Sequence, residues 1–212
     1  MVKLIVNELK THAPFTTLGA LTGIIIMVII IASNASSGIS QTMFYTLHPL
    51  HVLLSAVATT AMYKRYSKGK IWAAILIGYT GSIGIATLSD SIIPYMGEVL
   101  LDLPKSGIHI GFIEKWWLVN PLALIGIAIG YWRPTTKFPH AGHTLLSTWA
   151  SLFHMTMALG ETFNWVLLPL IFLFLFLAVW VPCCTSDIVY PLLFTRKGEK
   201  LPSQHLAHSH QH

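Results

Sequence analysis

The sequence has few charged residues and few cysteines. Asp, Glu, Lys and Arg make up 10% of its 212 residues, and 54% are hydrophobic, whereas about a quarter of a soluble domain is charged. The two cysteines, Cys183 and Cys184, are adjacent, which argues against a disulfide framework. Basic and aromatic residues are not interleaved as in nucleic-acid-binding surfaces. These scarcities exclude a soluble domain and a nucleic-acid partner, and they predict an integral membrane protein.

Long apolar stretches fill most of the chain. Since roughly 20 apolar residues cross a membrane, the sequence predicts an all-α, polytopic membrane protein with about six transmembrane helices. Their expected ranges are 14–33, 41–63, 71–94, 118–132, 139–159 and 163–194, with a break near Pro182 in the last. Basic segments lie at the N-terminus and after every second helix, at 64–70, 133–137 and 195–200. We therefore expect both termini in the cytoplasm and the chain in the cell (inner) membrane.

Three short patterns occur twice, in the same order. The pattern Pro-x4-Gly-x3-Gly begins at residue 14 and again at 121, a shift of 107 residues. The pattern His-x-x-His-x-Leu-Leu-Ser-x-x-Ala begins at 48 and again at 140, a shift of 92. The pattern Ser-Asp-x3-Pro begins at 89 and again at 186, a shift of 97. The first copy starts in the cytoplasm and the second outside, so the sequence predicts two inverted three-helix repeats, a frequent design of secondary transporters. A single membrane domain, 1–212, would contain repeat 1 (about 14–95), an outer connection (about 96–118), repeat 2 (about 119–194) and a His-containing tail (195–212).

Each repeat carries two histidines one helical turn apart and a later aspartate in an otherwise apolar stretch. This spacing places both imidazoles on one helix face, and a carboxylate inside a membrane needs a partner. Two imidazoles and a carboxylate suit a divalent transition metal: Zn, Mn, Fe, Co or Ni. The predicted metal ligands are His48, His51, Asp90, His140, His143 and Asp187. Secondary residues are Ser89, Ser186 and His154, the last being either a supporting group or a core histidine.

Three functions are compatible with these residues. We favour an integral membrane transporter of a divalent transition-metal ion, in which proton exchange at His and Asp drives release. The alternative is an intramembrane metal-dependent (zinc) hydrolase acting on a lipid, with a metal-bound water as nucleophile. In a third, structural, reading the polar groups only bridge helices. The two sets of ligands are either two gates of one path or two walls of one shared site.

Two family resemblances bear on this choice. The segments His48-Pro49-Leu50-His51 with Ser89-Asp90, and Cys183-Cys184-Thr185-Ser186-Asp187, resemble a family of prokaryotic heavy-metal or manganese exporters described as ten-span proteins, over about a third of the chain. That resemblance implies metal export, although this chain has about six spans. The combination of Ser, Asp and His also resembles membrane zinc hydrolases of the alkaline ceramidase type. We expect membrane lipid and a metal ion as partners, and Gly-x3-Gly packing within the chain or in a homo-oligomer.

Overall fold

All regular secondary structure in the computed structural model is helical within the residues that the structure describes, which are 2–33, 37–67, 70–134, 137–159, 163–184 and 189–194. This confirms the predicted all-α class. Asp187, Ser186 and the tail 195–212 lie outside the described residues.

The helices follow the predicted spans with shifted ends. The long helices are α1 (Val2–Ala32), α2 (Ser37–Tyr66), α6 (Trp116–Trp132), α7 (Lys137–Met157) and α8 (Leu168–Cys184). Short elements are α5 (Gly111–Glu114), the 3-10 turn η2 (Trp165–Leu167) and α9 (Tyr190–Leu193). α8 continues through Pro182 and ends at Cys184, close to the predicted break.

The third predicted span is longer than expected. It consists of α3 (Ile71–Thr87), a π-helical turn η1 (Leu88–Ile92) and α4 (Ile93–Leu100), which follow one another without interruption. Pro94 was expected to close this span, but it lies in the first turn of α4, where a missing N–H is tolerated. Glu98, expected in the outer connection, is therefore on a helix, and it is 1% exposed.

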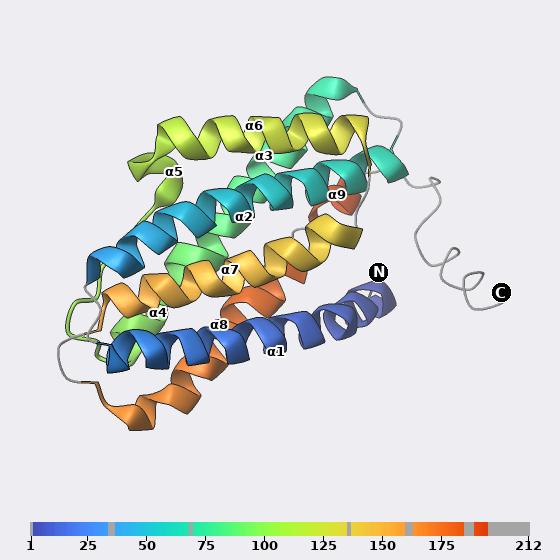
Figure 1. Cartoon of the computed structure of the whole chain (residues 1–212). Coiled ribbons are helices and arrows are strands. Elements are labelled where there is room, and N and C mark those ends of the chain that lie inside the picture. The colour runs from blue at the N-terminus through green and yellow to red at the C-terminus, as the bar shows by residue number, and fades with distance from the viewer. Residues whose placement is uncertain are drawn as a thin grey trace.

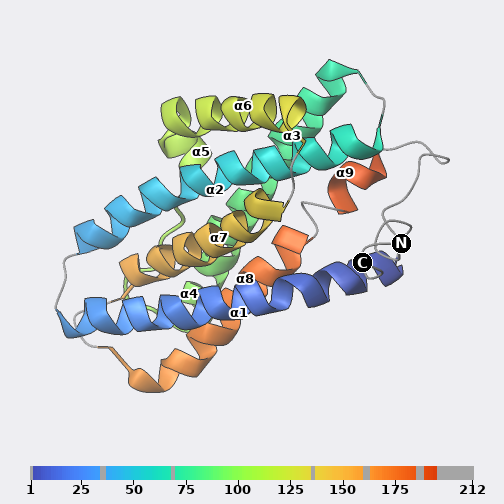
Figure 2. The same ribbon diagram turned by 45° about the vertical axis from the view of Figure 1, so that its right-hand side comes forward.

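The helices form two layers. In one, α6, α2, α7 and α1 lie side by side in that order, as both views show (Figures 1 and 2). In the other, α3 packs against α2 and α6, α8 packs against α1 and α7, and η1 contacts both α7 and α8. α2 and α7 are central in this arrangement, so polar side chains on their inner faces are removed from the surroundings of the protein.

Three segments of the described chain are long and apolar enough to cross a membrane: Ala13–Ala32, Ile71–Leu100 and Trp165–Cys183. Trp116–Trp132 is a shorter apolar helix. α2 and α7 are not among the segments that length and mean hydropathy identify. Their mean hydropathy is lowered by buried histidines, serines and threonines on their inner faces. The six-span prediction is thus matched in part, by these three segments.

Two glycine pairs allow close approach between helices of this layer. A Cβ added at Gly126 would lie 2.4 Å from the carbonyl oxygen of Leu53, and one at Gly130 would lie 2.5 Å from that of Val57, so α6 packs on the backbone of α2. Gly19 of α1 faces Thr148 of α7 in the same way, with a distance of 2.9 Å from its added Cβ to Oγ1. The Gly-x3-Gly patterns therefore contribute to packing within the chain.

Candidate functional site

A buried polar cluster lies where α2, η1 and α7 meet. It contains His48 and His51 of α2, Ser89 and Asp90 of η1, and Ser147 of α7, all 0–1% exposed. We call it the Asp90 cluster. The structure thus brings together three of the predicted ligands, His48, His51 and Asp90, with the predicted secondary residue Ser89.

The π-helical turn positions the carboxylate. Within η1 the residues Ser89, Asp90 and Ser91 are all buried, although they are consecutive. A π turn adds a residue to the helical repeat, and such turns occur frequently at functional sites. Here the turn presents Asp90 to α2 and Ser89 to α7, where Ser151 donates a hydrogen bond to the Ser89 carbonyl at 2.9 Å.

Both oxygens of Asp90 are fully engaged. Oδ2 lies 2.9 Å from Nδ1 of His48 and 2.7 Å from Nδ1 of His51. Oδ1 accepts hydrogen bonds from the hydroxyls of Ser89 and Ser147, each at 2.7 Å. An ionised carboxylate has about four acceptor positions, so these four donors saturate it. Asp90 is a structural acceptor in this geometry, with no lone pair left for a further ligand.

These contacts set the tautomers of the two imidazoles. Two nitrogens share one carboxylate oxygen, and with the carboxylate ionised both must donate from Nδ1–H. In a neutral imidazole that donates from Nδ1, the remaining ring nitrogen, Nε2, carries the lone pair. In His48 and in His51 this atom is buried and has no hydrogen-bond partner among the described residues. Buried polar atoms are nearly always satisfied, and a nitrogen with a lone pair can accept a hydrogen bond or bind a metal ion.

A glycine lies against the first of these nitrogens. A Cβ built on Gly111, the first residue of α5, would be 2.3 Å from Cδ2 and 2.6 Å from Nε2 of His48. Any other residue would therefore fill the space beside Nε2. The ring of His48 is held from the other direction by Phe44, which stacks on it with centroids 5.4 Å apart.

One histidine of the second predicted set joins this cluster. The ring of His143 stacks on that of His51, with centroids 5.7 Å apart and planes inclined by 13°. The side chain of His140 and the whole of Asp187 and Ser186 lie outside the described part of the structure. Of the two predicted sets, the described rings that meet are those of His51 and His143.

A second buried acid–base pair lies beyond Phe44. Nδ1 of His154 is 2.7 Å from Oε1 of Glu98, and the two side chains are 0% and 1% exposed. The edge of the Phe44 ring meets His154, with centroids 5.2 Å apart. Phe44 thus separates His154 from His48, so His154 belongs to a different cluster from the predicted ligands. We call His154 and Glu98 the Glu98 pair.

The Glu98 pair is followed towards the surface by three more polar side chains. The Tyr45 hydroxyl donates to Oε2 of Glu114 and lies 3.4 Å from Nδ1 of His109. Burial raises the pKa of Glu114, but hydrogen bonds from Tyr45 and from the Ile110 amide, together with nearby His109, outweigh it, so the pKa lies below its usual value. Glu114 is therefore ionised near neutral pH.

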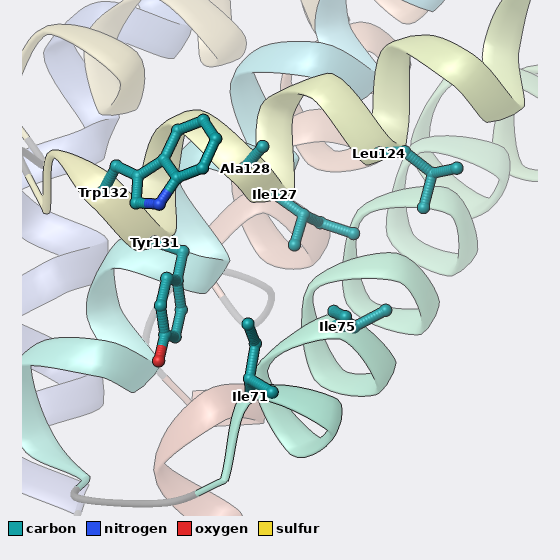
Figure 3. Close-up of a pocket in the computed structure, with 7 residues that line it drawn as sticks. All are labelled: Ile71, Ile75, Leu124, Ile127, Ala128, Tyr131 and Trp132. Carbon is teal, nitrogen blue, oxygen red and sulfur yellow. The ribbon is translucent and has the colours of Figure 1, made fainter.

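Two hollows on the described part of the chain are lined by residues outside the Asp90 cluster. A polar hollow of about 370 Å³ is lined by Gln41, Thr42, Tyr45, Thr46, Lys115, Trp117 and Leu118. A second pocket, of about 180 Å³, lies between α3 and α6 and is lined by apolar and aromatic side chains, Ile71 and Leu124 among them (Figure 3). That pocket offers no acid, base or metal ligand.

Within the described residues, no group of three or more His, Cys, Asp or Glu side chains is arranged to hold a metal ion. The saturation of Asp90 explains this, because its oxygens face hydrogen-bond donors and not a common centre. Searches of protein-family models, of curated proteins and of solved structures found no match to this chain.

Three residues of these clusters were not among the predicted ones. Ser147 is the serine of the repeated histidine pattern, four residues after His143, and this spacing on a helix was the available signal. Glu98 was assigned to a connection because Pro94 was expected to end the helix. Gly111 has no sequence signal, since only the fold brings it to His48.

Proposed function

We propose that this chain is a multi-pass membrane protein that transports a divalent transition-metal ion, which binds at Nε2 of His48 and of His51. The observation that carries the proposal is the pair of bare, buried Nε2 atoms beside a saturated carboxylate. Neutral imidazole with a free Nε2 lone pair is a preferred ligand of Zn²⁺ and its neighbours in the first transition series.

In this proposal Asp90 orients the ligands and does not bind the ion, which differs from the role the sequence predicts. Metal-binding histidines usually donate their other ring N–H to a carboxylate, which fixes the tautomer and makes the imidazole more basic. Both Nδ1 atoms meet Oδ2 of Asp90 in this way, at 2.9 and 2.7 Å. The negative charge of Asp90 also offsets part of the charge of a bound cation.

The site suits transient binding. Two imidazoles are fewer ligands than the four of a structural zinc site, and Gly111 lies directly against Nε2 of His48. A transported ion must bind well enough to enter and weakly enough to leave. The stacked ring of His143 lies next to His51, where it is placed to receive the ion from the first pair.

The helix contacts support the inverted repeat and hence transport. Gly19 and Gly23 of α1 contact Leu145 and Trp149 of α7, whereas Gly126 and Gly130 of α6 contact Leu53 and Val57 of α2. The glycines of α6 lie 107 residues after those of α1, and Leu145 and Trp149 lie 92 residues after Leu53 and Val57. The two sets of contacts therefore join equivalent positions of the two repeats. His51 and His143 are likewise related by the shift of 92, and they meet each other. Equivalent residues that touch are expected on the axis that relates two repeats.

By the same relation, His140, His143 and Asp187 form the equivalent set of repeat 2. Three segments are apolar and long enough to cross a membrane, and we assign α2, α6 and α7 as further crossings whose polar faces turn inward. With both termini in the cytoplasm, the Asp90 cluster would face the outer half of the membrane.

The test is ion flux. The full chain, with the tail histidines after residue 200 replaced by glutamine to remove competing ligands, is reconstituted into liposomes that contain a zinc-sensitive dye. We expect Zn²⁺ entry that falls to the background of empty liposomes in His51→Gln. The matched control is His12→Gln, a histidine that is not among the proposed ligands, and this variant should retain flux. Equal flux in His51→Gln and His12→Gln, or no flux above empty liposomes in the parent protein, would refute the proposal.

A further inference from the structure

The Glu98 pair is a buried acid and base that the proposed metal site does not use. His154 of α7 and Glu98 of α4 are enclosed in the bundle and joined by a 2.7 Å contact. Within the described residues, the ion-pair partner of Glu98 is His154. Buried titratable groups of this kind in a membrane segment are costly to maintain, and they commonly carry protons in pumps and transporters.

The hydrogen bonds fix where a proton would bind. The backbone N–H of His109 donates to Nε2 of His154 at 3.3 Å, so Nε2 carries the lone pair and Nδ1 carries the hydrogen that Glu98 accepts. Oε2 of Glu98 accepts the N–H of Gly107 at 3.1 Å. A proton that binds at Nε2 displaces the N–H of His109, because two donors cannot share a hydrogen bond.

A proton bound at Nε2 changes the net charge of the pair. With His154 neutral and Glu98 ionised, the pair has one net negative charge in a buried place, and protonation reduces this to zero. The titratable group that faces His154 from the connection is His109, with Tyr45 and Glu114 behind it, and α2 contributes the uncharged Phe44. From α1 and α8 the neighbours of this part of α7 are apolar, as Met27 and Ile171 illustrate. Asp90 of η1 contacts α7 two turns away, at Ser147.

A polar route connects the pair to the surface. The ring of His109 is about one-third exposed and lies edge-on to His154, with centroids 5.5 Å apart. Its Nδ1 is near the Tyr45 hydroxyl and Oε2 of Glu114, at 3.4 and 3.6 Å. Tyr45 also lines the polar hollow described above. Hydroxyl, carboxylate and imidazole groups thus lead from the aqueous side to the ring of His109 beside His154, and each relay group takes up one proton as it passes on another.

The same backbone segment connects the pair to the metal site. Residues 101–110 run from α4 to α5, and the Glu98 pair holds this segment at Gly107 and at His109. Two residues after His109, Gly111 lies against Nε2 of His48. Loss of the His109 bond on protonation would therefore loosen the segment that covers this nitrogen, which is also held by the amides of Lys105 and Gly107.

We infer that the Glu98 pair is a second binding site, for a proton, and that proton uptake there uncovers the metal site by releasing His109 and with it Gly111. The inference rests on the proposed metal site at His48 and His51. It makes the transported metal ion and the proton occupants of two separate sites, with the buried ring of Phe44 between them.

The first test needs no metal. Hydrogen–deuterium exchange of the full chain in detergent is measured at about pH 7.5 and about pH 5.5, a range over which imidazole changes charge. The intrinsic pH dependence of the exchange rates is corrected with an unstructured peptide of the same sequence. We expect protection of the amides of Gly107 and His109 to fall by about tenfold at the lower pH, with the amides of α6 as internal reference. His154→Gln and Glu98→Gln, either of which serves if the other does not fold, should abolish this change. Equal protection at both pH values in the parent protein would overturn the proton site.

The second test addresses the link to the metal. The rate of Co²⁺ association is measured for the parent protein and for His154→Gln, and the ratio of the two rates is compared between the same pH values. Competition of protons for His48 and His51 affects both proteins alike and cancels in the ratio. We expect the ratio to be several-fold larger at the lower pH. A constant ratio would overturn the link, whereas absence of Co²⁺ binding in both proteins would refute the proposed metal site and leave the exchange result to decide the proton site.

Discussion

Asp90→Asn tests the assigned role of the buried carboxylate. The substitution keeps the size of the side chain and one oxygen, so the Nδ1–H groups of His48 and His51 retain an acceptor, but the negative charge is lost. The amide nitrogen replaces Oδ1, which now accepts the hydroxyls of Ser89 and Ser147 at 2.7 Å each. Hydroxyls can turn and accept instead of donate, so we expect the variant to fold.

The magnitudes follow from the hydrogen bonds that change. Bonds to a charged acceptor contribute about 1.5–3 kcal/mol and neutral ones about 0.5–1.5 kcal/mol, so two weakened imidazole bonds should lower the free energy of unfolding by about 2–3 kcal/mol. Removal of a carboxylate behind a metal-binding histidine usually costs about 10–100-fold in metal affinity. We therefore expect Asp90→Asn to bind Zn²⁺ about 10–100-fold more weakly than the parent protein, and not to lose binding altogether.

The assay is a competition titration of Zn²⁺ against a fluorescent chelator, with the free energy of unfolding measured in parallel in mixed micelles. Nitrogen NMR of labelled histidines adds a direct view of the tautomers, because Nδ1–H and bare Nε2 are distinguishable. Complete loss of binding in a folded Asp90→Asn would show that Asp90 is itself a ligand. Unchanged affinity would show that it does not act on the imidazoles. Either result refutes the reasoning.

Three further substitutions test the surroundings of the site. Gly111→Ala forces a Cβ against the buried ring of His48, so it should weaken Zn²⁺ binding at least about tenfold and cost about 1–3 kcal/mol in stability, which a Zn²⁺ titration and thermal unfolding check. Ser147→Ala removes a hydrogen-bond donor to the carboxylate of Asp90 and should destabilise the fold by about 1.5–3 kcal/mol. The control is Ser55→Ala, at the equivalent place in the other repeat. It removes a hydroxyl that has no partner among the described residues, and it should change stability by less than about 0.5 kcal/mol. Gly126→Ala forces a Cβ against the α2 backbone and should cost about 1–3 kcal/mol in thermal unfolding, whereas Gly84→Ala, where no atom lies within 4 Å, should be neutral or stabilising. Equal effects of the two glycine changes would contradict the close packing of α6 on α2.

Much of the fold was predictable because its signals are local. Apolar stretches gave the helices, and the His48–His51 spacing gave a shared face. The two histidines and Asp90 belong to consecutive predicted helices, and consecutive helices are often neighbours. In the structure α2 and α3 are neighbours, and η1 follows α3, so His48 lies near Asp90. The six crossings, by contrast, remain an expectation, since length and hydropathy identify three segments in the described chain.

The rest of the site depends on contacts between distant segments. The sequence does not show that Asp90 accepts four hydrogen bonds, because the fourth donor, Ser147, comes 57 residues later. Nothing local marks the π turn at residues 88–92, which buries three consecutive polar residues. The pairing of His154 with Glu98 needed α4 to extend beyond Pro94, which propensity alone argued against.

The most direct test of the central claim is X-ray absorption at the zinc edge of the Zn²⁺-loaded protein, with the tail histidines replaced by glutamine. The account predicts imidazole nitrogen ligands at about 2.0–2.1 Å in the parent protein and in Asp90→Asn, and their loss in the double variant His48→Gln and His51→Gln. Imidazole scattering that persists in the double variant, or a parent spectrum without it, would contradict the assignment of these two histidines as the metal ligands.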